Sequence, residues 1–346
     1  MHRRTLVAGD RGVDDITLPG AGVCGRHRRG RRGGSLAGVQ RLVSTKVRGL
    51  VPVVPTPLLA DEALDEESFA QLAEFTLRYP FAAIWALASA GEDQNLPDDV
   101  IDEATRLFVK YFSGKLPVWV KTSHAGTRET IERTHRMSGL GINAAIVLFE
   151  HKRLSTDHVR RHFLDIAEQS PVPIVIYDNG NRGGEVDVSL YLELSAHPNI
   201  IAMKAGGSDL ARLTRLCLFA DPDFSVLTAG GGQILTGLAM GAAGHTAIPL
   251  LAFPERAFAV AEAVQGGDLE RARAEQRVIN DFITRMPKLQ NREVHGEVKC
   301  VLEIRGVINR HVSAPFMAAT EPQKTEFEKL IEQVDLFCKD KRWRAQ

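Results

Sequence analysis

The feature that most restricts the fold of this chain is a regular alternation of two kinds of segment, beginning near Lys46. Short apolar runs bounded by turn residues alternate with longer stretches in which apolar residues recur every three or four positions. The first pattern is typical of buried strands and the second of amphipathic helices. Eight apolar runs are present, at residues 49–55, 82–88, 117–122, 144–149, 173–178, 200–204, 224–229 and 244–248. Since a helical pattern follows each run, the sequence predicts an α/β protein with a parallel sheet, and eight units favour a closed (β/α)8 TIM barrel over an open sheet.

The helical pattern is clearest in residues 155–169. Ser155 occupies the position of an N-cap, and Val159, Phe163 and Ile166 fall on one face of the expected helix. Further helical patterns follow the last apolar run, at residues 268–283, 297–308 and 321–337. We therefore expect the barrel to span residues 46–266, and residues 267–346 to form additional C-terminal helices packed on its outside.

The first 45 residues differ from the rest of the chain. They contain the basic, glycine-rich tract "GRHRRGRRGG" and have no clear apolar period. A nucleic-acid arm, a targeting peptide and a disordered extension are the three interpretations. Arg3 and Arg4 resemble the start of an export signal, but charged residues such as Asp10 interrupt any apolar region after them. We expect residues 1–45 to be a disordered basic extension or the product of a start codon assigned too far upstream.

Charge and cysteine content argue against several classes of protein. Lysine plus arginine equals aspartate plus glutamate, at 43 each, so net charge gives no reason to expect nucleic acid or an anionic membrane as a partner. No apolar run reaches the roughly 18 residues of a membrane span. The cysteines are widely separated, at Cys24, Cys217, Cys300 and Cys338, as in the reduced thiols of a cytoplasmic protein. No spacing such as HExxH suggests a metal site.

In a (β/α)8 barrel the active site lies at the carboxyl ends of the strands. Polar side chains follow several of the predicted strands there: Ser89 and Glu92, Lys121 and His124, Glu150 and His151, Tyr177 and Asp178, and Lys204. The fifth and sixth strands are expected to be neighbours. Tyr177 and Lys204 could therefore project into one pocket.

Lys204 ends the apolar run of "NIIAMKAGG", where an isolated ammonium group would be costly to bury. Desolvation favours the neutral amine, which attacks a ketone to form a Schiff base. The protonated iminium is an electron sink, and a nearby tyrosine hydroxyl can move the protons. Two alternatives stay open at this point: that Lys204 simply bends into solvent, and that Lys121, in "PVWVK", takes the same role.

Five blocks of sequence, "GLVPVVPTPL", "ASAGEDQNL", "YDNGNRGG", "MKAGG" and "GAAGHTAI", occur in an order that resembles a known family. From about Val47 to Cys338 the chain is similar to the dihydrodipicolinate synthase / N-acetylneuraminate lyase family of class I Schiff-base lyases. The resemblance implies that Lys204 is the Schiff-base lysine and Tyr177 the catalytic tyrosine. It also implies that Ser89 keeps the hydroxyl that relays protons to this tyrosine.

The resemblance further implies a set of substrate-binding residues. Ala90 and Gly91 belong to the loop that holds the oxo-acid carboxylate, and backbone amides there could bind it. Arg182 matches the arginine that holds the aldehyde's carboxylate. Thr246, in "GAAGHTAI", is placed with this group. The family's chemistry needs no cofactor or metal, and its members usually associate as dimers or tetramers, so we expect a homodimer or homotetramer.

Several positions depart from the family pattern. Ala90 lacks the hydroxyl of the second threonine, Gly206 replaces a glutamate, and Glu150 and His151 replace a pair of tyrosines. Either His151 or His124 could act as an acid or base, oriented by Glu150, although loop histidines are more often solvated. "KTSH" and the late "GVI" favour the sugar-acid branch of the family.

Two further segments have plainer interpretations. The glycine-rich "TAGGGQ", residues 228–233, would let backbone approach the substrate, and His295 is expected to be an exposed loop residue.

These patterns together predict a cytoplasmic Schiff-base-forming lyase, an aldolase or a dehydratase. Its substrate would be a small molecule, pyruvate or a 2-oxo-3-deoxy sugar acid, and it would bind no nucleic acid and no membrane. One alternative is dihydrodipicolinate synthase proper, which joins pyruvate to aspartate semialdehyde. The other is a non-catalytic relative that binds an oxo acid.

Overall fold

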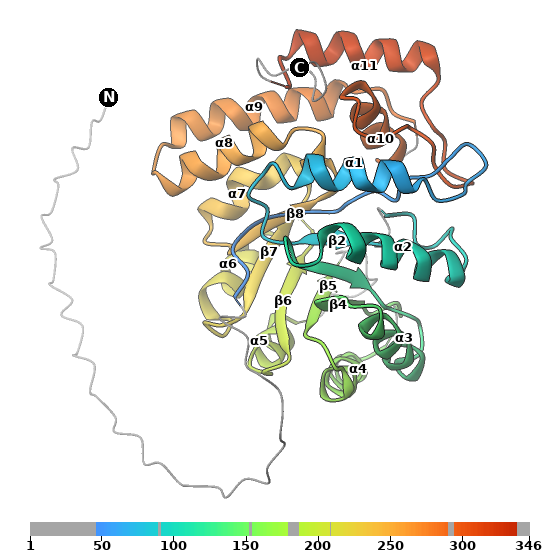
Figure 1. Cartoon of the computed structure of the whole chain (residues 1–346). Helices are drawn as coiled ribbons and strands as arrows, with labels where there is room; N and C mark the ends of the chain where they lie inside the picture. The colour runs from blue at the N-terminus through green and yellow to red at the C-terminus, as the bar shows by residue number, and fades with distance from the viewer. Residues whose placement is uncertain are drawn as a thin grey trace, which may run out of the picture. The chain divides into compact units, whose positions relative to one another are not determined.

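The computed structural model describes residues 46–88, 91–151, 154–178, 187–207, 209–289 and 294–337. The predicted extension, residues 1–45, lies outside them. Within the described ranges eight parallel strands form one sheet in the order β1-β8-β7-β6-β5-β4-β3-β2 (Figure 1). The strands are β1 (Gly49–Pro52), β2 (Ile84–Ala86), β3 (Val118–Lys121), β4 (Ala144–Leu148), β5 (Ile174–Asp178), β6 (Ile200–Ala205), β7 (Ser225–Ala229) and β8 (Gly244–Ala247).

A parallel bridge between Val53 and Trp85 joins the first strand to the second and closes the barrel. On the other side of β1, Gly244 pairs with Gly49, where a Cβ on Gly244 would lie 1.9 Å from the Gly49 carbonyl oxygen. A side chain at Gly244 would therefore push β8 away from β1. The predicted (β/α)8 barrel is confirmed.

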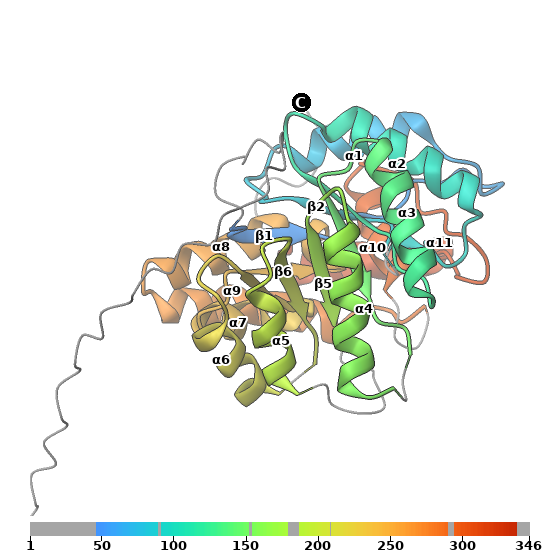
Figure 2. The same ribbon diagram turned by 90° about the horizontal axis from the view of Figure 1, so that it is seen from below.

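Helices surround the strands, as Figure 2 shows. They are α1 (Glu66–Thr76), α2 (Asp98–Phe112), α3 (Thr127–Gly139), α4 (Thr156–Gln169), α5 (Val188–Ser195), α6 (Leu210–Phe219), α7 (Ile234–Ala239) and α8 (Pro254–Gln265). Val159, Phe163 and Ile166 of α4 are buried, as their spacing predicted. Ser155 is at the N-cap position, but its side chain caps no backbone N–H; its hydroxyl instead lies 2.7 Å from Nδ1 of His158. The prediction of a side-chain cap was wrong because a nearer side-chain partner competes for the hydroxyl.

Strand side chains alternate between the two faces of the sheet, and the buried apolar side chains in the described part of the chain separate accordingly. A larger group fills the space between strands and helices. A smaller group fills the barrel, and Trp85, Trp119 and Tyr177 are its aromatic members. The ring centroids of Trp85 and Trp119 are 6.4 Å apart. The interior of the barrel is therefore filled by side chains, and these aromatic rings pack beneath the carboxyl ends of the strands.

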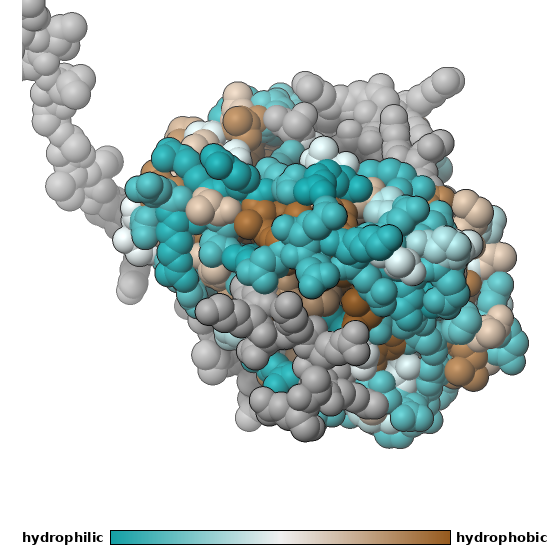
Figure 3. All heavy atoms as spheres, turned by 90° about the horizontal axis from the view of Figure 1, so that it is seen from above, coloured by the Kyte–Doolittle hydropathy of each residue, from teal (hydrophilic) through white to brown (hydrophobic). Residues whose placement is uncertain are grey.

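Three helices follow the barrel, as predicted: α9 (Leu269–Arg285), α10 (His295–Ile304) and α11 (Glu321–Gln333). α9 packs against α8, and α11 packs against α9 and α10. The molecular face on this side is mostly hydrophilic, with small hydrophobic patches between the polar side chains (Figure 3). No helix in the described part of the chain is long and apolar enough to cross a membrane.

Candidate active site

Tyr177 and Lys204 lie side by side at the carboxyl ends of neighbouring strands, because β5 and β6 pair in a register that places one opposite the other. The Lys204 Nζ is 4.6 Å from the centroid of the Tyr177 ring and 5.3 Å from that of Trp85. Trp85 packs its ring edge-on against Tyr177, with centroids 5.4 Å apart and planes at 84°. The lysine amine thus sits over two aromatic faces.

Lys204 is partly buried, and among the described residues no carboxylate and no hydrogen-bond acceptor pairs with its amine. Aromatic faces attract a cation without removing a proton donor or blocking the nitrogen. The amine therefore remains accessible to an electrophile. Trp85 was not among the predicted site residues, although its inward position follows from the alternation of residues 82–88.

Lys121, the alternative lysine, has a different environment. Its Nζ lies 2.8 Å from an Asp93 carboxylate oxygen and 3.7 Å from one of Glu150, and its side chain is only 4% exposed. Two carboxylates so close hold the Lys121 nitrogen away from an incoming substrate. The geometry favours Lys204 over Lys121 as the free amine.

His124 follows β3 and His151 follows β4, and the hydrogen bonds of both rings go to the backbone of residues 125–126. Nε2 of His151 lies 2.9 Å from the Ala125 carbonyl oxygen, and Nδ1 of His124 accepts a hydrogen bond from the Gly126 N–H at 3.2 Å. Both side chains are exposed. Glu150, expected to orient one of them, pairs with Lys121 instead.

The predicted carboxylate-binding loop is described in part. Ser89, Ala90 and Arg182 lie outside the described residues. Gly91 is buried, and its carbonyl oxygen accepts a hydrogen bond of 2.6 Å from the Thr56 hydroxyl. This bond fixes the end of the loop against the segment that follows β1.

Two buried polar residues of β8 point to opposite faces of the strand. Thr246 is fully buried, and within the described residues its hydroxyl has no hydrogen-bond partner. His245 is also fully buried, and its Nδ1 lies 2.7 Å from the Thr228 hydroxyl. Burial, and then the positive charge of Lys204, lower the pKa of His245 from 6.5 to about 3. His245 is therefore a neutral structural residue behind the site.

We expect this histidine to make the protein sensitive to acid. Its folded pKa is about 3 and its ordinary value 6.5, so between these pH values the unfolded chain binds more protons than the native state. The contribution is fully present above about pH 6.5 and is lost as the pH falls, by about 1.4 kcal/mol for each pH unit between the two pKa values. Urea unfolding of wild type and of His245→Asn between pH 7 and pH 4 measures it. An equally steep loss of stability in both proteins would contradict this assignment.

His295 is not the exposed loop residue that the sequence suggested. It begins α10, is 2% exposed, and stacks on Phe316 with ring centroids 4.3 Å apart. The prediction was wrong because the partner, Phe316, lies far along the chain.

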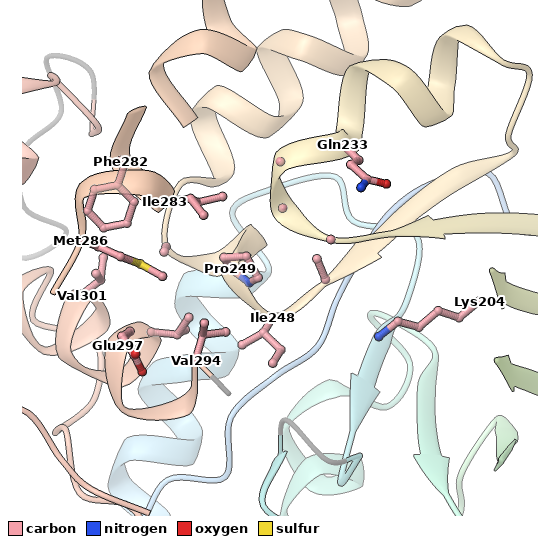
Figure 4. Close-up of a pocket in the computed structure, with 16 residues that line it drawn as sticks. Lys204, Gln233, Ile248, Pro249, Phe282, Ile283, Met286, Val294, Glu297 and Val301 are labelled. Atoms are coloured by element: carbon pink, nitrogen blue, oxygen red, sulfur yellow. The ribbon is translucent and has the colours of Figure 1, made fainter. Parts of the chain in front are cut away.

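A cavity of about 420 Å³ opens beside Lys204. One wall is the glycine-rich segment Gly230–Gln233 together with Ile248 and Pro249, at the ends of β7 and β8. The opposite wall comes from α9 and α10, as the close-up in Figure 4 shows. The C-terminal helices therefore do more than pack on the outside of the barrel, since they also cover part of its catalytic end. In the described residues no group of three or more His, Cys, Asp or Glu side chains could hold a metal ion.

A (β/α)8 barrel with a lysine and a tyrosine side by side at the carboxyl ends of neighbouring strands has residue types that Schiff-base catalysis can use. The family model described as the dihydrodipicolinate synthetase family matches residues 46–334, so the chain belongs to that family. It is accordingly a lyase of the aldolase type.

Individual relatives agree with this placement. The chain is 28% identical over 236 residues to the 4-hydroxy-tetrahydrodipicolinate synthase of Xanthomonas axonopodis pv. citri, covering 68% of this chain and 78% of the relative. It is 26% identical over 295 residues to the enzyme of that name from an Exiguobacterium species, covering 84% and 97%. Among solved structures, YagE from E. coli K12, a prophage protein of the same family in complex with pyruvate, aligns with a TM-score of 0.76 at 23% identity, covering 84% and 99%.

Proposed function

We propose that Lys204 forms a Schiff base with the C2 carbonyl of pyruvate or of a longer 2-oxo acid, and that Tyr177 moves the protons. One observation carries this proposal: the Lys204 amine lies 4.6 Å from the Tyr177 ring centroid, at the edge of a cavity, with no carboxylate partner among the described residues. A lysine nitrogen that no carboxylate holds can approach a substrate carbonyl and attack it.

In the proposed reaction the amine adds to the ketone, and the carbinolamine loses water to give an iminium ion. The iminium draws electrons from the neighbouring carbon, so that either a C3 proton leaves or the C3–C4 bond breaks with release of an aldehyde. Both routes give an enamine, which takes up a proton or adds to an aldehyde, and water then releases the product from Lys204. The Tyr177 hydroxyl carries these protons, helped by Ser89.

The remaining predicted residues have binding roles in this proposal. Backbone amides of Ser89 and Ala90 hold the substrate carboxylate. Gly91 shapes this loop, since its N–H donates to the Ala88 carbonyl oxygen. The Thr246 hydroxyl, which is buried without a partner among the described residues, donates a further hydrogen bond to the substrate. Arg182 holds the distal end of the substrate.

Trapping with borohydride tests the proposal directly. The protein is incubated with pyruvate and sodium borohydride, and intact mass and peptide mapping locate the reduced adduct. We expect the adduct on the peptide that contains Lys204. An adduct on Lys121 would overturn the assignment of the lysine, and no adduct with pyruvate or a longer 2-oxo acid would support the non-catalytic alternative.

Replacing Tyr177 by phenylalanine should remove the group that moves protons while leaving the shape of the binding pocket unchanged. The ring still packs on Trp85 and beneath Lys204, but the hydroxyl is lost. We expect kcat to fall by about 10²–10⁴-fold, the usual contribution of a general acid or base. Steady-state kinetics measures this fall, and a kcat within threefold of wild type would show that another group moves the protons.

The second candidate function is dihydrodipicolinate synthesis proper. It is favoured by the name shared by the two relatives, 4-hydroxy-tetrahydrodipicolinate synthase. Glu150 and His151 in place of the family's paired tyrosines count against it. Turnover of pyruvate with aspartate semialdehyde, at a rate above that with other aldehydes, would establish this candidate in preference to a different aldehyde specificity.

We propose, finally, that the chain works as a homodimer or homotetramer in the cytoplasm. The family resemblance supports the assembly, and the widely spaced cysteines support the compartment. Light scattering of the purified protein measures the assembly, and a monomer at micromolar concentration would contradict it.

A further inference from the structure

The cavity beside Lys204 is much larger than pyruvate needs, and most of its lining is apolar. The three polar side chains among its described lining residues are Lys204, Gln233 and Glu297. Cavities of about 300–1,000 Å³ with apolar walls and few polar groups commonly bind small molecules far larger than a three-carbon acid. The question is therefore what part of the substrate fills the remaining volume.

Figure 4 shows how the cavity is oriented with respect to the lysine. The amine of Lys204 points toward Ile248 and Pro249, and Phe282 of α9 and Met286 at its C-cap lie on the far side of these residues. A substrate attached to Lys204 would therefore extend its far end toward α9 and α10.

The two walls are already in contact, so the cavity does not depend on a later closure. A Cβ on Gly231 would lie 3.0 Å from Cδ1 of Ile283 on the α9 wall, and 2.6 Å from Cγ of Pro249 on its own wall. The glycine is what allows the loop after β7 to approach both side chains so closely. Phe282, at 2% exposure, holds α9 in the core behind the cavity.

The far part of the cavity offers few partners to a hydroxylated chain. Gln233 is exposed to solvent, and on the α9–α10 wall the one polar side chain among the described lining residues is the buried Glu297, whose Oε1 accepts a hydrogen bond of 3.0 Å from the Leu289 N–H. A buried hydroxyl without a partner costs free energy, whereas an alkyl or aryl group against Met286 and its neighbours gains it. A second carboxylate near Glu297 would be repelled.

We propose that this chamber, the part of the cavity between Pro249 and helices α9 and α10, receives an apolar alkyl or aryl group on the aldehyde partner. The inference rests on the Schiff base proposed at Lys204. The substrate class is then a 4-hydroxy-2-oxo acid, R–CH(OH)–CH2–CO–COO⁻, with an apolar R. In the cleavage direction the 4-hydroxyl loses its proton, the C3–C4 bond breaks, R–CHO leaves, and the electron pair passes to the enamine on Lys204. Protonation at C3 and addition of water then release pyruvate.

The experiment measures kcat/KM for condensation of pyruvate with propanal, butanal and pentanal, and with glyceraldehyde as a polar aldehyde of similar size to butanal. We expect kcat/KM to rise by up to about fourfold for each added methylene, and to exceed the glyceraldehyde value at least tenfold for pentanal. Ile283→Trp, which fills the chamber from α9, should flatten this series. Val278→Trp is the matched control, because Val278 is on the same helix, is also partly exposed, and does not line the cavity.

Borohydride trapping with pyruvate alone, done in parallel, distinguishes failure of this inference from failure of the proposed function. An adduct on Lys204 together with a flat series, or with a preference for glyceraldehyde, would overturn the apolar chamber and leave the Schiff-base lyase intact. The absence of an adduct with pyruvate and with a longer 2-oxo acid would overturn both. A rising series that Ile283→Trp and Val278→Trp flatten equally would also overturn the chamber.

Discussion

Lys204→Ala should lower kcat/KM by about 10⁴-fold or more while leaving the fold intact. In the proposed mechanism every step passes through a covalent bond to Nζ of Lys204, and removal of an enzyme's nucleophile typically has effects of this size. The side chain is partly exposed and makes no hydrogen bond or ion pair with the described residues, so its removal should cost little stability. Steady-state kinetics, borohydride trapping and thermal unfolding of the variant measure the three effects.

Lys204→Arg is the matched variant for charge. A guanidinium keeps the positive charge over Tyr177 and Trp85 but stays protonated and cannot attack a ketone. We expect Lys204→Arg to be as inactive as Lys204→Ala and to give no adduct. Substantial turnover by either variant would contradict the Schiff-base mechanism at this lysine.

The second large effect concerns stability. Lys299 of α10 and Glu92, in the loop after β2, form an ion pair of 2.5 Å in which both side chains are fully buried. Glu92 also accepts hydrogen bonds from the N–H and hydroxyl of Ser313, at 2.6 and 2.8 Å, and Lys299 donates to the His311 carbonyl oxygen at 2.6 Å. This network ties the end of the candidate carboxylate-binding loop to the C-terminal helices.

Lys299→Met should lower the free energy of unfolding by about 3–5 kcal/mol, because it leaves the Glu92 carboxylate buried without its cation. Burial already lowers the pKa of Lys299, against the opposing effect of Glu92, which indicates how much the pair depends on both members. Urea unfolding measures the loss. Adding Glu92→Gln to Lys299→Met removes the uncompensated charge and should recover part of the stability.

The exposed pair Lys110–Glu66 provides the control. It has the same 2.5 Å separation, but its side chains are 59% and 54% exposed. Lys110→Met should change stability far less than Lys299→Met, since solvent screens exposed pairs. Equal losses in the two variants would show that burial of the Glu92–Lys299 pair is not what matters.

The fold could be predicted from the sequence because its determinants are local. The alternation of apolar runs and amphipathic stretches marked all eight strands, and each observed strand lies within its predicted run or extends it by a single residue, as β6 does at Ala205. Ser155 and His295 show where local reasoning failed. Their partners, His158 and Phe316, were chosen by side-chain geometry that no periodic pattern contains.

The candidate site also has a part that the sequence predicts and a part that only the structure shows. Lys204 and Tyr177 could be found from the sequence, because their positions at the ends of consecutive strands follow from the barrel's topology and the family resemblance implies their roles. The strand pattern by itself leaves the choice between Lys204 and Lys121 open, and the resemblance only implies Lys204. The two lysines end similar strands, and what distinguishes them is that Asp93 and Glu150 reach Lys121 and no carboxylate of the described chain reaches Lys204.

The sequence by itself therefore determined the barrel, the helices that follow it and the strand ends at which Lys204 and Tyr177 lie, since apolar periodicity and strand order are properties of short segments. Tertiary structure alone decided which groups meet: Trp85 beneath Lys204, Glu92 against Lys299, and α9 against the loop after β7. These contacts join residues far apart in the chain, and they depend on how side chains of particular shapes pack in three dimensions. The apolar chamber is a product of that packing.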